Sequence, residues 1–421
     1  MLFERKKYLN RLIAGRGNGM VKIVTGVRRC GKSFLLFNIF APWLVENGVA
    51  ADHIIGLSLD DFKSKKLRQP EVLLDYIDEK IQAASVSSDK FYVILDEIQL
   101  VDEFVEVMLS LMHKLDVEVY VSGSNSKFLS SDVVTEFRGR GQEIRVRPLS
   151  VEEFLTGTGK EFQLGLHEYF VYGGLPQVAL LGTEEEKVNF LNEMYEVTYL
   201  RDVVERNHLR NAEGMRELVR VLASGIGSCC NPKRIADTFK SAARIKISDQ
   251  TIKEYIGHLK DAFLIEEALR YDVKGRKYIG TETKYFFEDM GLRNVVLGFR
   301  QVEETHIMEN VIYNELRTRG YLVDVGLVEG WERDTDGKSI RKHLEVDFVA
   351  NKGSLRYYIQ SAYALPTSEK AYQEERPLRN IGDSFKKIVI VNDDIVLRRN
   401  DVGVVTMSIR DFLMNEQALE M

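Results

Sequence analysis

The sequence is poor in cysteine. Only three cysteines occur among the 421 residues, and two of them, Cys229 and Cys230, are adjacent. A disulfide framework and a structural zinc site both need several spaced thiols, so this content excludes both. The sequence therefore predicts a protein of a reducing compartment, the cytoplasm.

Long apolar runs are also missing. No segment approaches the ~18 uninterrupted apolar residues of a membrane-spanning helix, and the charged N-terminal stretch MLFERKKYLNRLI lacks the apolar core of a signal peptide. Proline is scarce, and no low-complexity linker is visible. We therefore expect no membrane partner, and we expect two to four domains that pack together rather than hang on tethers.

An excess of positive charge is the third absence. The formal net charge is -6, with 44% hydrophobic and 29% charged residues, which is typical of an ordinary globular protein. A protein that coats nucleic acid is strongly basic, so any nucleic-acid contact must come from a local patch.

The segment VKIVTGVRRCGKSFLL has the pattern of a phosphate-binding loop. Gly26 to Ser33 fit glycine, four residues, Gly-Lys-Ser, between a β-branched strand at 22–25 and an apolar helix at 33–40. In such a loop, backbone N–H groups surround the β-phosphate, the lysine reaches the β- and γ-phosphates, and the serine hydroxyl is a ligand of Mg²⁺. The alternative is a chance strand–turn–helix with a solvated lysine. The residues predicted to bind nucleotide are Gly26, Val27, Arg28, Arg29, Cys30, Gly31, Lys32, Ser33 and Phe34, with Lys32 also catalytic and Ser33 on the metal.

Cys30 in this loop has two interpretations. A thiol beside cations and a helix start could have a lowered pKa and be reactive. The more conservative interpretation is a small residue that fills the loop.

A pair of carboxylates follows the buried-type strand FYVILDEIQ. Asp96 is placed to hold Mg²⁺ and Glu97 to polarise the attacking water as a general base. Two acids at the end of a strand could also cap the next helix. The phosphate-binding loop upstream favours the first interpretation, and the two motifs together predict ATP and Mg²⁺ as cofactors.

A glycine-flexed basic loop precedes another strand, expected at 143–146. Arg138 and Arg140 lie in this loop, and either could stabilise transition-state charge at the site of a neighbouring subunit, which would make the protein a homo-oligomer. A surface basic loop is the equal alternative. The alternation in QEIRVRPL could place Arg145 and Arg147 on a solvated strand face.

An ordered set of motifs resembles prokaryotic AAA+-type ATPases of the archaeal-ATPase kind. The motifs are TGVRRCGKSFLL, LDEIQ, SGSNSKFL, RGR followed by RPLSVEEFL, YGGLPQV, YLRDVVERN and KYFFEDMGLRNV. The resemblance covers nearly the whole chain and implies an α/β protein in four parts. These are a P-loop AAA-type ATPase core at 1–160, a helical lid at 161–212, a winged-helix domain at 213–290 and an α/β restriction-endonuclease-like domain at 291–421.

The resemblance also implies roles for single residues. AAA-type ATPases keep a polar sensor side chain after the strand that neighbours the Mg²⁺-binding strand. Asn125 or Ser124 would be that sensor and would bridge the γ-phosphate and the attacking water, unless SGSNS is a plain turn. Gly173 and Gly174 would form a swivel at the start of the lid.

The middle of the chain has the order of a winged helix. Three helical patterns between residue 213 and about residue 269 precede a hairpin whose turn contains Lys274, Arg276 and Lys277. In that fold the third helix enters the major groove of DNA and the wing contacts the backbone. DNA is therefore a predicted partner, although winged helices also serve as packing modules.

The C-terminal part resembles a nuclease that has lost a catalytic group. Glu309 or Glu315 stands for the helix glutamate of restriction-like nucleases and Asp347 for the strand aspartate, but the acid-x-lysine position holds Gln360 and Ala362. Carboxylates hold Mg²⁺ there and the lysine assists hydroxide formation, and Lys352 in the hairpin turn would have to replace it. The sequence predicts a degenerate domain.

The function predicted from the sequence is Mg²⁺-dependent binding and hydrolysis of ATP, with the nucleotide state coupled to DNA or a protein partner. Two alternatives remain, a nucleotide-gated DNA-binding regulator with little turnover and an ATP-dependent nuclease.

Overall fold

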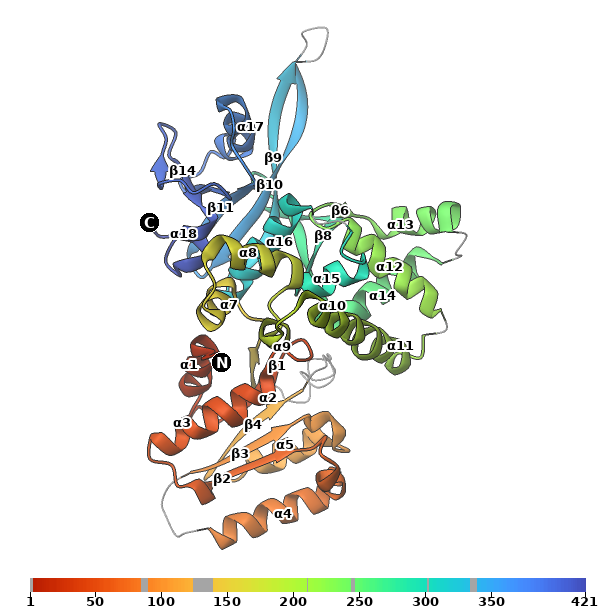
Figure 1. The fold of residues 1–421 in the computed structure, drawn as a ribbon, viewed down its shortest axis with the longest axis vertical. Coiled ribbons are helices and arrows are strands. Elements are labelled where there is room, and N and C mark those ends of the chain that lie inside the picture. The colour runs from red at the N-terminus through yellow and green to blue at the C-terminus, as the bar shows by residue number, and fades with distance from the viewer. Residues whose placement is uncertain are drawn as a thin grey trace. The chain divides into compact units, whose positions relative to one another are not determined.

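The computed structural model describes residues 3–84, 90–123, 139–209, 211–243, 247–300, 303–333 and 339–421. The chain divides into two compact units, Met1–Pro148 with Asp261–Phe263, and Leu149–Lys260 with Leu264–Met421. Among these residues, each unit contains one sheet (Figure 1). The boundaries of the four predicted parts stay predictions, because two units do not resolve them.

The first unit is built on a parallel five-stranded sheet in the order β2-β3-β4-β1-β5. Its strands read as nearly continuous apolar runs, as expected of a parallel sheet that is covered on both faces. The strands are β1 Val21–Thr25, β2 Ile54–Ser58, β3 Phe91–Asp96, β4 Val117–Ser122 and β5 Gly141–Arg145. The strands expected at 22–25, in FYVILDEIQ before Asp96 and Glu97, and at 143–146 are thus present, within two residues at each end.

Helices cover this sheet through an apolar core. The core joins Leu73 and Ile77 of α4 and Met108 and Leu111 of α5 to strand residues such as Val93, and each such side chain contributes roughly 1.5–3 kcal/mol through burial. The helices of the unit are α1 Lys6–Ala14, α2 Lys32–Phe34, η1 Leu35–Phe40, α3 Ala41–Glu46, η2 Ala51–His53, η3 Phe62–Arg68, α4 Pro70–Ala83, η4 Ile98–Leu100 and α5 Phe104–Met112.

The second unit contains a nine-stranded sheet in the order β13-β14-β12-β11-β10-β9-β7-β8-β6. Its strands are β6 Cys229–Cys230, β7 Ile265–Asp272, β8 Lys277–Phe287, β9 Leu322–Arg333, β10 Ser339–Lys352, β11 Leu355–Ala362, β12 Lys386–Val391, β13 Arg398–Arg399 and β14 Val404–Ser408. Its helices are α7 Val151–Thr158, α8 Phe162–Tyr172, α9 Pro176–Leu180, α10 Glu184–Glu193, η6 Met194–Leu200, α11 Arg201–Arg206, α12 Ala212–Ser224, α13 Pro232–Thr238, η7 Phe239–Ala243, α14 Asp249–Asp261, α15 Met290–Val296, α16 Glu304–Thr318, α17 Ser368–Arg379 and α18 Ile409–Met414.

The predicted order of helices and hairpin is present in this unit. Helix α12, strand β6, helices α13 and α14, and the hairpin β7–β8 follow one another along the chain. The Ser248 hydroxyl accepts the N–H of Thr251 and caps α14, as a serine at this position is expected to do. Strand β7 also pairs with β9, in parallel, so the hairpin and the C-terminal strands share one sheet.

The strands β9 and β10 form a long antiparallel ribbon whose far end extends beyond the sheet (Figure 1). A bulge between Val346 and Val349 interrupts their pairing. Helix α16 packs on the sheet at β8, β9, β10 and β11. This arrangement places the residues that the sequence assigned to a nuclease-like site on neighbouring elements.

Gly173 and Gly174 allow a close approach to Asp289. The N–H of Gly174 donates to Asp289 Oδ2 at 2.7 Å, and its carbonyl accepts the N–H of Leu149 at 2.7 Å. A Cβ on Gly173, whose φ is 76°, would lie 2.2 Å from Asp289 Oδ1. These contacts hold both glycines in the structure, and the expectation of a swivel stays a prediction.

Among the described residues, no helix combines the length and the apolar character that crossing a membrane requires.

Candidate nucleotide-binding site

The loop between β1 and α2 has the backbone of a phosphate cradle. Gly26 has a φ of 138° and Gly31 a φ of 96°, conformations in which glycine has no steric penalty. A Cβ on Gly26 would lie 2.0 Å from the carbonyl oxygen of Val146, so no other residue fits without displacing the loop. Arg29 also adopts a positive φ, 63°, and such strain is concentrated at functional sites.

The Lys32 side chain lies inside this loop. Its Nζ donates to the carbonyl oxygens of Gly26 and Val27, at 3.0 and 3.1 Å, and only 5% of the side chain is exposed. The ammonium is therefore already held at the start of the cradle. Phosphate oxygens that enter the loop would meet it together with the N-terminus of the helix.

The Cys30 side chain packs between the loop and the residues that follow β5. It is fully buried, and its Sγ donates to the carbonyl oxygen of Val146 at 3.3 Å. Val146 also follows β5 and accepts the close approach of Gly26. Cys30 therefore stabilises the loop against the neighbouring strand, which favours the loop-filling interpretation over the reactive-thiol one.

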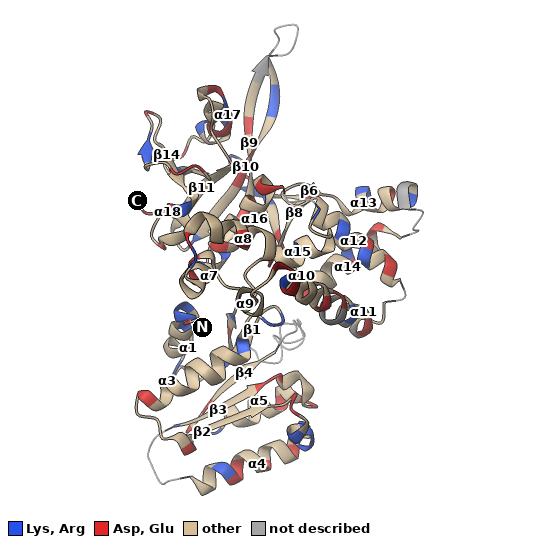
Figure 2. Cartoon of the chain, in the orientation of Figure 1, with Lys and Arg blue, Asp and Glu red and all other residues tan. Residues whose placement is uncertain are grey.

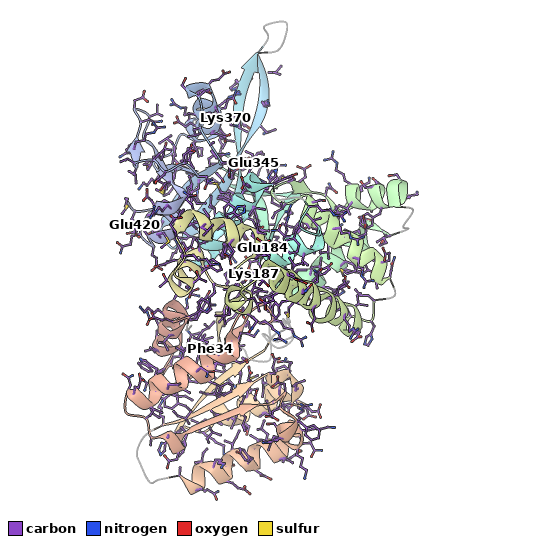
Figure 3. The ribbon with its side chains drawn as sticks, in the orientation of Figure 1. Phe34, Glu184, Lys187, Glu345, Lys370 and Glu420 are labelled. Carbon is purple, nitrogen blue, oxygen red and sulfur yellow. The ribbon has the colours of Figure 1, made fainter. Side chains whose placement is uncertain are left out.

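The remaining loop residues differ in exposure. Arg28 is half-buried and Arg29 is exposed, while Ser33 is exposed at the first turn of the helix, as is Phe34, which Figure 3 labels. The Ser33 hydroxyl is therefore accessible to a ligand. Phe34 presents an apolar ring, 39% exposed, at the rim of the site.

Asp96 ends strand β3 at the edge of the sheet that the loop occupies. Its carboxylate accepts a hydrogen bond from the Ser122 hydroxyl at the end of the adjacent strand β4. Burial raises the pKa of Asp96, whereas the Ser122 and Ser33 hydroxyls and the Lys32 ammonium act in the opposite direction. Lys32 and Ser33 therefore lie close enough to Asp96 to act on its carboxylate, and the roles assigned to the three residues stay predictions.

Glu97 follows directly in a left-handed conformation, with φ 53° and ψ 44°. Its N–H donates to Ser122 Oγ at 3.4 Å, and its carboxylate accepts a hydrogen bond from the Gln99 amide. The side chain is half-buried. These contacts orient the carboxylate beside Asp96, where a general base would be needed.

Arg140 does not belong to the site of its own chain. Its carbonyl accepts the N–H of Val21, at the amino end of β1, whereas the phosphate loop follows the carboxyl end. The five residues between them span roughly 16 Å. The predicted role at a neighbouring subunit stays a prediction. Ser124, Asn125 and Arg138 lie outside the described residues.

The expectation that Arg145 and Arg147 line a solvated strand face was wrong. Arg147 is only 6% exposed, its N–H donates to Tyr8 Oη at 3.1 Å, and its carbonyl accepts a hydrogen bond from Arg5. Arg145 is half-buried and pairs with Thr25 in the register of β1 and β5. Arg145 therefore lies at the same edge of the sheet as the phosphate loop.

The predicted nuclease-like residues are only partly brought together. Glu309 and Asp347 influence each other electrostatically, whereas Glu315 forms an ion pair with Arg319 on its own helix. Lys352 donates to the carbonyl oxygen of Arg319 at 2.9 Å, away from the carboxylates. The ammonium group of Lys284 on β8 lies beside the Glu309 carboxylate instead. We did not predict this residue.

The predicted wing is exposed. Lys274, Arg276 and Lys277 all point into solvent, and Lys274 Nζ lies 3.8 Å from Glu329 Oε2 on β9. On α14, the predicted third helix, two lysines already form ion pairs. Lys253 pairs with Asp249, and Lys260 pairs with Glu267. Along α10, α11, α12 and α14 basic and acidic residues are interspersed (Figure 2).

Comparisons with known proteins agree with the first unit. The family model described as "AAA domain" matches residues 18–155. An uncharacterized protein of Haemophilus influenzae is 32% identical over 394 residues, which cover 92% of this chain and 93% of the relative. The chain belongs to this AAA-type P-loop family. A second relative, an uncharacterized protein of Methanocaldococcus jannaschii, is 28% identical over 93% of this chain and 85% of its own length.

Other matches to this AAA-type protein are less informative. Residues 163–303 match a domain of unknown function. The solved structures include the Aeropyrum pernix Orc1 protein in complex with DNA, with 12% identity over 71% of this chain and 93% of that chain, and TM-score 0.29. They also include Cdc6p from Pyrobaculum aerophilum, with 10% identity over 72% and 95%, and TM-score 0.30. Because both TM-scores are below 0.5, we draw nothing further from them.

The AAA-type site fits a nucleotide with Mg²⁺. The loop leaves no room for a Cβ at Gly26, and its helix start exposes the Ser33 hydroxyl near Asp96. Hydroxyl and carboxylate oxygens are ligands that Mg²⁺ prefers, together with phosphate oxygens and water. We did not predict that Ser122 would contact Asp96. A serine at the end of an apolar strand that neighbours the Asp96 strand could have indicated this contact.

Proposed function

We propose that the protein binds and hydrolyses ATP in a Mg²⁺-dependent reaction and couples the nucleotide state to the binding of DNA or a protein partner. The observation that carries the proposal is the meeting of Lys32, Ser33 and Asp96 at one edge of the parallel sheet, with Glu97 beside them. Membership of the AAA-type family supports it.

Each residue has a role that follows from its position. Backbone N–H groups of the loop and the Lys32 ammonium would hold the phosphates, and the Ser33 hydroxyl and the Asp96 carboxylate would hold Mg²⁺. Bound Mg²⁺ supplies neutralisation of charge on the phosphate oxygens. Glu97, oriented by Gln99, takes the proton of the attacking water.

The test compares binding and turnover of ATP in matched lysine variants. Lys32→Ala should lose nucleotide affinity at least tenfold, measured with a fluorescent ATP analogue, and should release no phosphate. Lys66→Ala, which alters an exposed lysine of η3, is the control and should behave as the wild type. Wild-type protein that binds ATP no better than Lys32→Ala would refute the proposal.

The exposed wing supports a second candidate, a nucleotide-gated DNA-binding regulator with little turnover. Lys274, Arg276 and Lys277 form a compact basic turn that duplex phosphates can reach. If each makes one phosphate contact, replacing all three by alanine should reduce the slope of log affinity against log salt by about 2.7. The control is the exposed pair Arg398 and Arg399.

The measurement is fluorescence anisotropy of a labelled duplex across a salt series, with and without ATP. Equal slopes for the wild type and the wing variant would remove the wing from the interface. An affinity that ignores ATP would exclude gating while leaving hydrolysis untouched. The third class of function, an ATP-dependent nuclease, is not supported at the predicted acid-x-lysine position, because Lys352 donates to the Arg319 carbonyl and Ala362 cannot replace a lysine.

A further inference from the structure

A cluster of buried charges lies where α16 covers the nine-stranded sheet. It contains three carboxylates, those of Glu309, Glu345 and Asp347, which we call the acid cluster. The Lys284 ammonium lies among them, with Nζ 2.8 Å from Glu309 Oε1 and 2.7 Å from Glu345 Oε1. Glu345 is labelled in Figure 3 at the base of the β9–β10 ribbon.

Burial makes this arrangement unusual. The side chains of Lys284, Glu309 and Asp347 are each less than a tenth exposed. Burial alone would lower the pKa of Lys284, but Glu309, Asp347 and Glu345 outweigh burial and raise that pKa, so the ammonium stays charged. Burial and the charge of Glu309 raise the pKa of Asp347 well above its ordinary value. The single ammonium group of Lys284 thus interacts electrostatically with three carboxyl groups.

An unused oxygen lies beside the cluster. Gln360 on β11 is more than nine-tenths buried, and its Oε1 has no hydrogen-bond partner. In the antiparallel register Phe348 pairs with Ile359, and Asp347 and Gln360 are the next residues of β10 and β11 beyond this pair. The N–H of Ser361 donates to Asp347 Oδ2 at 2.8 Å. A buried oxygen acceptor without a donor indicates that a cation could be accommodated here.

We propose that the Lys284 ammonium occupies the place of a divalent cation in the acid cluster, and that removing it converts Glu309, Asp347 and Gln360 into a site for a hard divalent cation. Carboxylate and amide oxygens are the ligands that Mg²⁺ and Mn²⁺ prefer. The described part of the chain offers no group of three or more His, Cys, Asp or Glu side chains that could hold a metal ion, so the Gln360 amide oxygen would have to complete the site beside Glu309 and Asp347.

The neighbours of the cluster favour a hard cation over a soft one. Cys229 Sγ lies 3.7 Å from Glu345 Oε2, but burial and the Glu345 charge raise the pKa of its thiol to about 11. A protonated thiol is a poor metal ligand. His306 Nδ1 lies 3.8 Å from Glu309 Oε2.

The experiment counts Mn²⁺ bound to the full-length, nucleotide-free protein, from the electron paramagnetic resonance signal of free Mn²⁺. Lys284→Met should bind one Mn²⁺ per chain more than the wild type, and Mn²⁺ should raise its melting temperature. The extra ion should vanish in the double variant with Asp347→Asn. Any Mn²⁺ at the loop site is the same in all variants.

Lys187→Met is the matched control. Lys187 is also buried, donates to the Glu168 carboxylate, and lies in the same unit (Figure 3). Lys160 contacts the same carboxylate, so loss of Lys187 leaves Glu168 with a cation. This variant should gain no Mn²⁺.

Two results would overturn the proposal. One is a folded Lys284→Met protein that gains no Mn²⁺. The other is a wild-type protein that already binds an ion which Asp347→Asn alone removes, since the ammonium would then not exclude it. If circular dichroism shows that Lys284→Met does not fold, the second comparison decides, and equal stoichiometry in the wild type and Asp347→Asn supports the proposal.

Discussion

The Ser122 hydroxyl donates a hydrogen bond to the carboxylate of Asp96, across the adjacent strands β4 and β3. The same oxygen accepts the N–H of Glu97. A single serine therefore contacts both acidic positions of the candidate site. It fixes the carboxylate that would bind Mg²⁺ and the backbone of the residue that would activate water.

Ser122→Ala should weaken the response to Mg²⁺ more than the binding of nucleotide alone. A hydrogen bond to a charged group contributes about 1.5–3 kcal/mol, which corresponds to a loss of roughly tenfold or more in MgATP hydrolysis. Phosphate release and ATP binding with and without Mg²⁺ measure the two effects. Ser110→Ala, at an exposed serine of α5, should change neither, and an equal loss in both variants would contradict the assignment.

Glu97→Gln should bind ATP with nearly wild-type affinity and trap it. The amide keeps the shape of the side chain but cannot accept a proton, and loss of general-base catalysis costs about 10²–10⁴ in rate. Single-turnover hydrolysis of radiolabelled ATP measures the step directly. Glu103→Gln is a close control, because Glu103 is exposed and also has a positive φ, 49°. Hydrolysis by Glu97→Gln at the wild-type rate would show that another group is the base.

Titration of Asp289 should make the free energy of unfolding depend on pH in the mildly acidic range. Burial raises its pKa from 3.8 to about 6, although the N–H groups of Gly174, Leu292 and Gly291 counteract the rise. Because the folded pKa is the higher one, the folded chain binds more protons between about pH 4 and pH 6, and this contribution to stability is lost as pH rises through that window. The shift corresponds to about 3 kcal/mol.

The measurement is the free energy of unfolding in denaturant between pH 4.5 and pH 7, for the wild type and for Asp289→Asn. The free energy of unfolding of the wild type minus that of the variant should be largest at pH 4.5 and should decrease toward pH 7. The exposed Asp237, changed to Asn, is the control for the removal of a carboxylate. A difference that is constant with pH would show that Asp289 does not titrate in this range.

The sequence pointed to the parts of the candidate nucleotide site that lie in short continuous motifs. Lys32 and Ser33 adjoin one strand, and Asp96 and Glu97 another, so a local pattern of strand and turn was enough to identify them. Arg147 was misjudged because the alternation of a strand does not reveal what covers its outer face, and here Tyr8 and Arg5 of the N-terminal segment cover it.

Lys284 could not be found in this way. It lies 25 residues before Glu309 and 61 residues before Glu345 in the chain, and the packing of α16 on β8, with the pairing of β7 with both β8 and β9, brings these elements together. The pattern of a lysine followed by three aromatic residues predicts a strand in which the lysine side chain is exposed. Its burial follows from tertiary packing, which the sequence pattern does not encode locally.

The parallel pairing of β7 with β9 has a consequence for fragments of this protein. A gene truncated after residue 290 would keep β7 but delete β9, and the N–H and C=O groups of Arg270, Tyr271 and Asp272 that face β9 would lose their partner strand. Such an open edge recruits other chains. Lys284 would also remain in the fragment without Glu309 and Glu345. We therefore expect the middle region to aggregate when expressed by itself, and we expect limited proteolysis to release it only together with the C-terminal strands.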